Sequence, residues 1–204
     1  SAGLLAYFAY QFAEYAVFWA YGPLYPLYVA TLALAVSGFA LLLYGLDLDA
    51  LSRRVGAAYP RRAIVAYSGL VVVILLGLWL PVLVGTFGAE VTEELQGAST
   101  LVVPAFDLGL LVPLAVFTAI ATYRRLPVGY LLGMLVLVKG ASMALAISSM
   151  LVVEWLVTEE LLVPPLVIFV LMALVSVVIA ARALRAIDED AALVKQIYSL
   201  EDSL

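Results

Sequence analysis

Hydrophobic residues in this chain form six long runs, separated by short polar or proline-containing stretches. The runs occupy residues 3–21, 25–45, 62–85, 103–122, 128–153 and 162–184. A bilayer core of about 30 Å requires about 20 apolar residues per helical crossing, so each run is long enough, or nearly so, to span a membrane. The pattern predicts an all-α polytopic membrane helical bundle with six transmembrane helices in residues 1–185, followed by an acidic tail at 186–204.

Prolines punctuate this pattern at the expected helix ends. They are Pro23, Pro26, Pro60, Pro104, Pro127, Pro164 and Pro165. Pro113 differs because it lies inside the fourth run, where it removes a backbone donor. We therefore predict a kink in the fourth helix, eased by Gly109 one turn earlier.

Basic residues fall almost entirely on one side of the predicted membrane. These are Arg53, Arg54, Arg61, Arg62, Arg124, Arg125, Arg182, Arg185 and Lys195. The loops on the other side contain only acidic charges, which are Glu90, Glu93, Glu94, Glu154, Glu159 and Glu160. The positive-inside rule then places both termini in the cytoplasm, and we expect a multi-pass protein of the cell membrane.

Aromatic residues agree with this orientation. Several lie near the predicted outer boundary, where an interfacial belt is expected: Tyr21, Tyr25, Tyr28, Trp79, Phe87 and Trp155. On the inner side, residues 47–55 predict a short surface helix with Leu48, Leu51 and Val55 facing lipid. The acidic tail is interpreted as a solvated continuation of the sixth helix, with docking of a partner as the alternative.

Composition removes several classes of function. Of 204 residues, 66% are hydrophobic and 12% charged, and the chain has neither cysteine nor histidine. The usual ligands of zinc, copper and haem are therefore missing, and we expect neither a metal nor a cofactor. The net charge of −5 comes without a basic patch, which excludes nucleic acid as a partner. An intramembrane enzyme is the least favoured class because no GxSxG motif or other catalytic constellation is present.

Three ionisable residues other than tyrosine lie inside the predicted spans: Glu14, Asp107 and Lys139. A charge at the bilayer centre costs about 2.5–3.5 kcal/mol on insertion scales, so such residues usually pair, face the bundle interior or mark a pathway. Lys139 is the deepest of the three, and its long side chain can extend toward Glu14 or toward an intervening water. We predict a Glu14–Lys139 pair, with Asp107 too shallow for direct contact unless the Pro113 kink moves it inward.

Helix one adds a polar and aromatic stripe to this pair. Tyr7, Gln11 and Glu14 share one helical face, Tyr10 lies beside it, and Ser142 is one turn from Lys139. These groups could line a small cavity that binds a small molecule or ion, or carries protons. Alternatively, Glu14 and Lys139 form a structural ion pair that fixes helix packing.

Asp107 and the glycines of the fifth run also have two interpretations each. Asp107 follows Pro104 by three residues, so it can instead be a first-turn carboxylate favoured by the helix dipole. Gly129 and Gly133 form a GxxxG pair extended by Gly140, which predicts a close-packing surface either within the bundle or between subunits.

The segments AFDLGLLVPL and YRRLPVGYLLGMLVLVKG resemble a pattern in uncharacterised prokaryotic multi-pass membrane proteins. In that pattern an Asp-Leu pair and a proline open one helix, and an Arg-Arg-x-Pro-x-Gly-Tyr turn leads into the next. The resemblance covers about residues 103–140 and implies a fold but no activity. The layout of six helices is also similar to the substrate-binding subunits of energy-coupling-factor transporters.

Two functions remain open. The chain either binds or transports a small molecule or ion through the polar intramembrane site, or is a non-catalytic accessory subunit of a membrane protein complex. Expected partners are the lipid bilayer, a small-molecule ligand, and a membrane protein or a second copy of the chain. A cavity that contacts Glu14 and Lys139 favours the first function, whereas a dry core favours the second.

Overall fold

The computed structural model describes residues 2–18, 24–86, 101–159 and 161–201, and every element in these ranges is helical. The elements are α1 (Ala2–Phe18), α2 (Tyr25–Tyr44), α3 (Leu48–Arg53), α4 (Arg61–Thr86), α5 (Val102–Phe106), the π-helix η2 (Asp107–Leu111), α6 (Val112–Tyr123), α7 (Pro127–Thr158) and α8 (Val163–Glu201). Since α5, η2 and α6 follow one another without a break, they form one long helix with a π-helical segment. The all-α prediction is confirmed.

Five segments of the described chain are long and apolar enough to cross a membrane: Tyr25–Tyr44, Arg61–Gly85, Val102–Tyr123, Pro127–Thr158 and Val163–Ile187. Their mean hydropathy ranges from 2.0 to 2.8. Long apolar helices that leave most side chains unburied require a lipid environment, so the chain is a membrane-embedded helical bundle. The first predicted run corresponds to α1, of which 17 residues are described.

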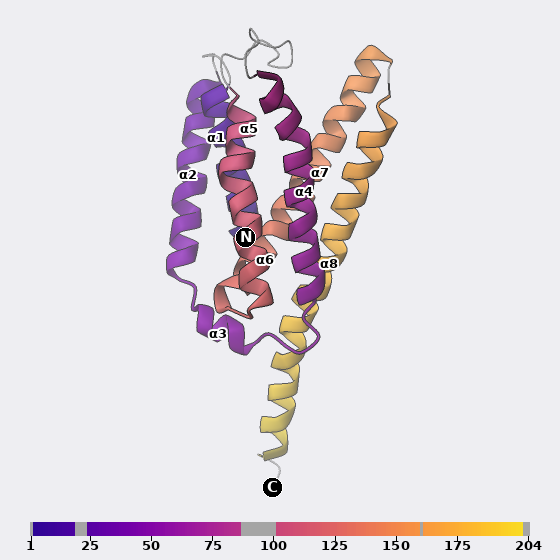
Figure 1. Cartoon of the computed structure of the whole chain (residues 1–204). Coiled ribbons are helices and arrows are strands. Elements are labelled where there is room, and N and C mark those ends of the chain that lie inside the picture. Colours follow the sequence, from indigo (N-terminus) through magenta and orange to yellow (C-terminus); the bar gives the residue numbers. More distant parts are fainter. Residues whose placement is uncertain (1, 19–23, 87–100, 160, 202–204) are drawn as a thin grey trace.

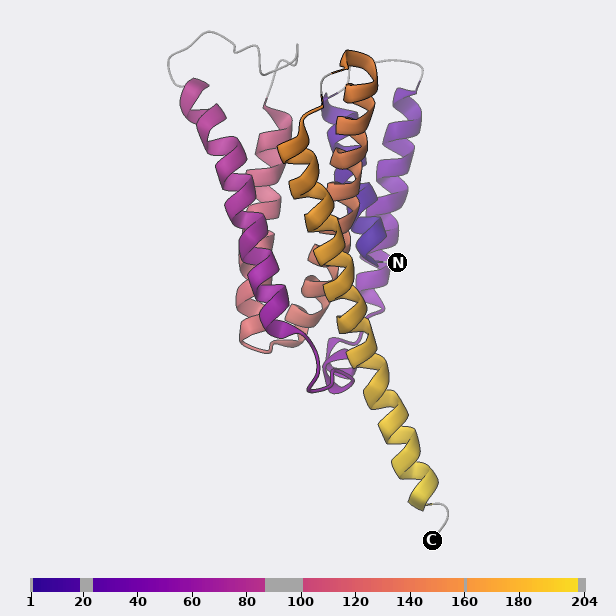
Figure 2. The same cartoon turned by 90° about the vertical axis from the view of Figure 1, so that its right-hand side faces the viewer.

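The long helices run along a common direction, and α7 lies against α1, α6 and α8 (Figure 1). α2 packs mainly against α1, whereas α4 packs mainly against α6. α1 begins part-way along the bundle, where Gly3 faces Val138 of α7. α8 continues well past the predicted end at residue 184 to Glu201, so the sixth run and most of the tail are one helix that projects beyond the bundle (Figure 2).

A buried cluster joins α4, α7 and α8 at the end of the bundle near α3. Its members are Tyr59, Ile64, Tyr67, Tyr130, Val136, Leu137, Ile179, Ala183 and Ala186. Two glycines of α7 permit this packing, because a Cβ on Gly133 would lie 3.1 Å from Ile64 Cγ2 and one on Gly140 would overlap Tyr67. The predicted small-residue surface thus contacts helices of the same chain.

The connection between α6 and α7 explains the Arg-Arg-x-Pro-x-Gly-Tyr segment. Arg125 adopts a left-handed conformation (φ 60°), and the Leu126 amide donates to the Ala121 carbonyl at 2.9 Å, which closes the end of α6. α7 then starts at Pro127, whose fixed φ suits a first helical turn. Gly129 is required because a Cβ there would lie 2.5 Å from the Ala121 carbonyl carbon.

α3 forms the predicted short helix but faces inward rather than toward lipid. Asp47 caps it by accepting a hydrogen bond from the Ala50 amide at 2.9 Å, which lowers the pKa of this exposed carboxyl group. Leu51 and Val55 pack against the buried cluster, and Leu48 lines the cavity described below. The lipid-facing prediction for these three residues was wrong because the bundle offers α3 an apolar surface to cover.

The fourth helix contains the predicted irregularity, and its form is a π-helical segment. Pro113 has no amide proton to donate to the Gly109 carbonyl, and its ring would clash with that carbonyl in a regular helix. The helix accommodates the proline by widening at Asp107–Leu111, where the Val112 amide donates to the Asp107 carbonyl. Asp107 is the first residue of this π-helical segment.

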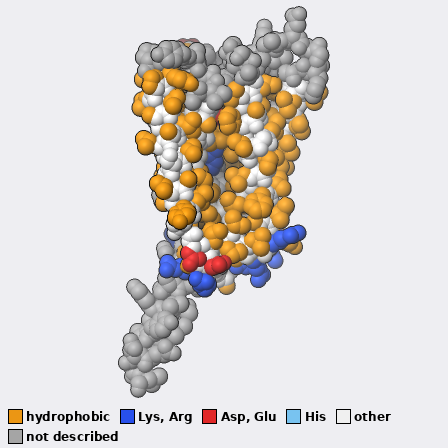
Figure 3. All heavy atoms as spheres, turned by 90° about the vertical axis from the view of Figure 1, so that its left-hand side faces the viewer, with side chains coloured by type: hydrophobic (Ala, Val, Ile, Leu, Met, Phe, Trp, Pro, Cys, Tyr) orange, Lys and Arg blue, Asp and Glu red, His pale blue; other side chains and the backbone are white. Residues whose placement is uncertain are grey.

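Lysine and arginine side chains gather at one end of the described molecule, near α3, below a surface that is otherwise largely hydrophobic (Figure 3). This basic end comprises Arg53, Arg54, Arg61, Arg62, Arg124, Arg125, Arg182 and Arg185. The one-sided charge pattern of the sequence is therefore also one-sided in space. The side chain of Lys195 and residues Glu90, Glu93, Glu94 and Glu160 lie outside the described residues, as do Tyr21 and Phe87.

Candidate functional site

A cavity of about 1470 Å³ lies inside the bundle, and all the described helices, α1 to α8 with η2, contribute to its walls. Most lining side chains are aliphatic or aromatic, and they extend along α7 from Val128 to Met150. The 22 steps from Val128 to Met150 correspond to about 33 Å of helix, close to the thickness of a hydrocarbon core. Polar groups on this wall are few, and most belong to the predicted site: Tyr7, Tyr10, Gln11, Glu14, Asp107 and Lys139.

Asp107 is buried at the start of η2, and both of its carboxylate oxygens have donors. Oδ1 accepts a hydrogen bond from the Tyr10 hydroxyl, and Oδ2 accepts one from the indole Nε1 of Trp79 at 2.7 Å. Three helical segments, α1, α4 and η2, therefore meet at one carboxylate. Hydrogen bonds to a charged acceptor in a low-dielectric interior are among the stronger ones in proteins, so we regard this contact as a structural anchor.

The first-turn interpretation of Asp107 was wrong. The fourth helix begins at Val102, so Asp107 lies beyond its first turn, and its side chain binds tyrosine and tryptophan side chains rather than backbone amides. Depth counted from Pro104 had suggested that Asp107 was too shallow to reach this region. The deeper helix placement and the π-helical segment bring it to the level of Tyr10.

Lys139 lies between two tyrosine rings of α1. Its Nζ is 3.3 Å from the ring centroid of Tyr10 and 5.1 Å from that of Tyr7. The aromatic faces stabilise the ammonium group by cation–π interaction, which is stronger where water is excluded. Its recorded hydrogen-bond contact is a weak one, to the sulfur of Met143 at 3.8 Å. Lys139 thus has donors that the described chain leaves available to the cavity.

Glu14 lies near Lys139 without contacting it. The charges of the two residues interact, yet no Glu14 oxygen lies within 4.0 Å of Nζ, and the ion pair recorded among the described residues is Arg53–Asp47. Glu14 Oε2 accepts from Gln11 Nε2 at 3.1 Å, whereas Oε1 is buried with no hydrogen-bond partner. Glu14 and Lys139 therefore form no direct ion pair, and both are incompletely satisfied groups in one cavity.

Of the remaining predicted site residues, three lie in the cavity wall and one lies outside it. Tyr7, Tyr10 and Gln11 line the cavity with Glu14, so the stripe of helix one faces the site as expected. Ser142 does not line it, because its hydroxyl donates to the Val138 carbonyl of its own helix at 2.9 Å. The helical spacing to Lys139 was correct, but one turn is enough to rotate a side chain partly out of the wall.

Trp79 is the site residue that the sequence did not reveal. Its position near a predicted membrane boundary suggested a belt residue, whereas its indole points inward to Asp107. Pro81, two residues later, lies inside α4 and was a usable signal, because a proline in a spanning helix often accompanies a functional irregularity. Without the position of Asp107, however, no pattern in the run assigned an inward partner to Trp79.

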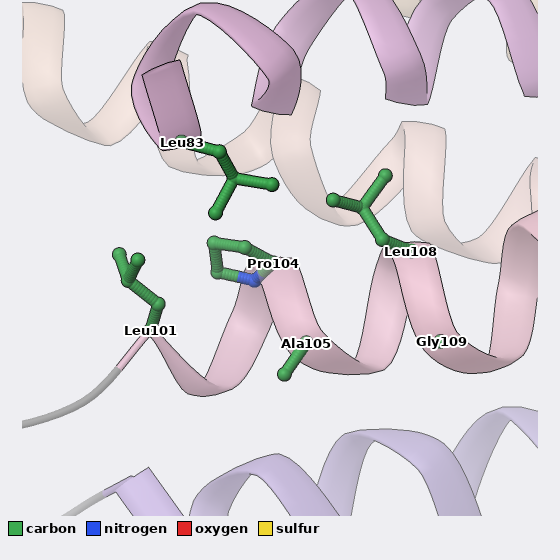
Figure 4. Close-up of a pocket in the computed structure, with 6 residues that line it drawn as sticks. All are labelled: Leu83, Leu101, Pro104, Ala105, Leu108 and Gly109. Carbon is green, nitrogen blue, oxygen red and sulfur yellow. The ribbon is translucent and has the colours of Figure 1, made fainter. Parts of the chain in front are cut away.

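A second, smaller hollow of about 350 Å³ lies between α4 and the start of the fourth helix. Its lining side chains converge from both elements, with Leu83 on one side and Leu101, Pro104, Ala105, Leu108 and Gly109 on the other (Figure 4). All six residues are apolar, so this groove offers no directional contact and is suited to lipid chains. We place the functional site in the larger cavity, where the charged groups are.

Comparison of the chain with protein-family models, with curated proteins and with solved structures finds no match.

Proposed function

We propose that this chain is a multi-pass protein of a prokaryotic inner membrane that binds a small molecule in the cavity lined by Glu14 and Lys139, as a binding or transport component. The supporting observation is the convergence of incompletely paired polar groups on a largely apolar cavity. Ligand sites typically combine an apolar wall with a few polar groups that fix orientation. An accessory subunit has no need for such a cavity, so the binding function is favoured over that alternative.

Mass spectrometry in mild detergent tests this proposal directly. The protein is purified from its native membrane and examined for a copurified molecule of defined mass. We expect such an adduct, and we expect Lys139→Met to lose it because the substitution removes the ammonium group while keeping a long apolar side chain. Ser142→Ala is the matched control, one turn away on α7 but outside the cavity wall. Absence of an adduct, or equal retention by both variants, would overturn the proposal.

We further propose six crossings with the basic end in the cytoplasm. The spatial clustering of arginines supports this orientation through the positive-inside rule. The chain has no cysteine, so labelling by maleimide reports only on a single introduced cysteine. In intact cells an impermeant maleimide should label Val157→Cys, whereas Ala57→Cys should react only after lysis. Labelling of the two positions in the reverse order would contradict the orientation.

A further inference from the structure

We propose that the ligand is an uncharged, long-chain amphiphile with a hydroxyl head, which enters from the lipid phase between α2 and the η2–α6 part of the fourth helix. This inference rests on the proposed function and names its ligand class. Four features of the cavity carry it: the unsatisfied atoms, the sum of charges, the distribution of apolar wall, and the position of the opening.

The polar atoms that lack hydrogen-bond partners indicate which donor and acceptor the ligand's head group must carry. Lys139 offers N–H donors, and Glu14 Oε1 is a buried acceptor without a donor. Buried polar atoms normally have partners, so an unpaired acceptor beside available donors indicates a missing group. A single hydroxyl meets both needs, because its oxygen accepts from Lys139 Nζ while its proton is donated to Glu14 Oε1. Since no Glu14 oxygen lies within 4.0 Å of Lys139 Nζ, the two charged groups do not pair directly and a hydroxyl is the bridging group that we propose.

The charges argue against an ionic head. Glu14, Asp107 and Lys139 carry a formal sum of −1 when all three are ionised. An added carboxylate or phosphate would increase this negative charge in a low-dielectric site. An ammonium head would balance the sum, but it cannot accept a hydrogen bond from Lys139 and would place a second cation beside Nζ. Carrying a charge to mid-membrane depth has its own cost of a few kcal/mol, which a hydroxyl avoids.

The wall defines the rest of the ligand. Lys139 lies eleven residues from Val128 and eleven from Met150, midway along the α7 part of the cavity. The remainder of the cavity is overwhelmingly apolar. A long hydrocarbon chain can therefore extend from the polar centre along α7 and cover this apolar wall, which buries apolar surface on both the ligand and the protein. A small polar metabolite would leave most of that wall without a complementary partner.

The position of the opening indicates the route. Leu43 of α2, Leu110 of η2 and Leu114 of α6 line the cavity yet remain 38%, 55% and 36% exposed, so they form part of its rim. α2 packs mainly against α1 and has no comparable packing against η2 or α6, which leaves this side open. Figure 3 views the molecule from the α2 side and shows a hollow between columns of hydrophobic side chains. A mouth with leucines on a lipid-facing surface admits molecules from the bilayer.

Fluorescence of Trp79 provides the test, because this residue lines the cavity. The other two tryptophans, Trp19 and Trp155, are replaced by phenylalanine, and the protein is placed in phosphatidylcholine vesicles. Stearyl alcohol brominated in mid-chain is titrated alongside the matched brominated acid, amine and methyl ester. We expect saturable quenching by the alcohol at a membrane concentration at least tenfold lower than for the other three probes.

Variants of the polar residues distinguish specific binding of the probe's head group from simple partitioning of the probe into the membrane. Lys139→Met and Glu14→Ala should each abolish the preference for the alcohol, whereas Ser142→Ala should retain it. Equal quenching by the methyl ester would show that no donor to Glu14 is needed, and tighter binding of the acid or the amine would assign an ionic head; either result overturns the proposed class. Quenching that rises linearly with every probe would indicate partitioning only and would also overturn it.

The route is tested by closing the opening. Leu43→Cys with Leu114→Cys, joined by a flexible bis-maleimide, should slow the onset of quenching at least tenfold, and the same double variant treated with a monofunctional maleimide is the control. An unchanged rate overturns lateral entry. These outcomes are separable from the proposed function: if a native adduct depends on Lys139 but no brominated probe saturates, the binding site stands and the ligand class is wrong.

Discussion

Asp107 and Glu14 are both buried carboxyl groups facing one cavity, yet their environments differ. Asp107 has a donor on each oxygen, from Tyr10 and Trp79, and so connects three helical segments. Glu14 accepts one hydrogen bond, from Gln11 on its own helix, and its other oxygen is buried with no partner. The difference indicates that one acid serves the fold and the other is available to a ligand, because a completed hydrogen-bond network rigidifies whereas an incomplete one leaves affinity for another molecule.

Among the substitutions that test this difference, Asp107→Ala is expected to change stability most. The substitution leaves the buried Tyr10 hydroxyl and the part-buried Trp79 indole without an acceptor, at about 1–3 kcal/mol for a fully buried donor. We expect a clear loss of stability in denaturant titration of the detergent-solubilised protein. Asp107→Asn should lose less, since its remaining carbonyl oxygen can still accept one hydrogen bond. Wild-type stability of Asp107→Ala would show that Asp107 is not an anchor.

Tyr10→Phe should have a smaller effect. It removes one of the two donors to Asp107 but keeps the aromatic ring over Lys139, so we expect a loss of about 1 kcal/mol in the same titration. Retention of the native adduct should accompany this loss. If the adduct disappears while stability is unchanged, the Tyr10 hydroxyl belongs to the ligand site rather than to the anchor.

Glu14→Gln is expected to change stability least among the substitutions at the two acids. The amide keeps an oxygen that can accept from Gln11, and no donor is lost from Oε1, so the change in unfolding free energy should stay within about 0.5 kcal/mol. Ligand retention, followed by mass spectrometry, should nevertheless fall. A stability loss as large as that of Asp107→Ala would make Glu14 structural as well.

Ser142→Ala should affect neither property. Its hydroxyl bonds to the backbone of its own helix and lies outside the cavity wall, so both the denaturation midpoint and the native adduct should match those of the unsubstituted protein. Loss of the adduct in this variant would mean that the cavity extends beyond the residues assigned to it.

Much of the site was predictable because the bilayer makes buried polar residues conspicuous. Glu14, Asp107 and Lys139 stood out as charges in apolar runs, and helical periodicity placed Tyr7, Tyr10 and Gln11 beside Glu14. The partners were not predictable. Periodicity fixes which residues share a face of one helix, but it does not fix the depth at which one helix meets another, so it selected a Glu14–Lys139 pair instead of the Tyr10–Asp107–Trp79 contact.

The sequence by itself therefore determined the helices, their approximate ends and the one-sided placement of arginines, because these depend on apolar length, proline chemistry and local charge. Only the tertiary structure decided that α3 turns inward, that the Pro113 irregularity is a π-helical segment aiming Asp107 at two donors, and that α2 stands apart from the fourth helix. The physical reason is that each of these depends on which surfaces meet across the bundle, which no single helix encodes.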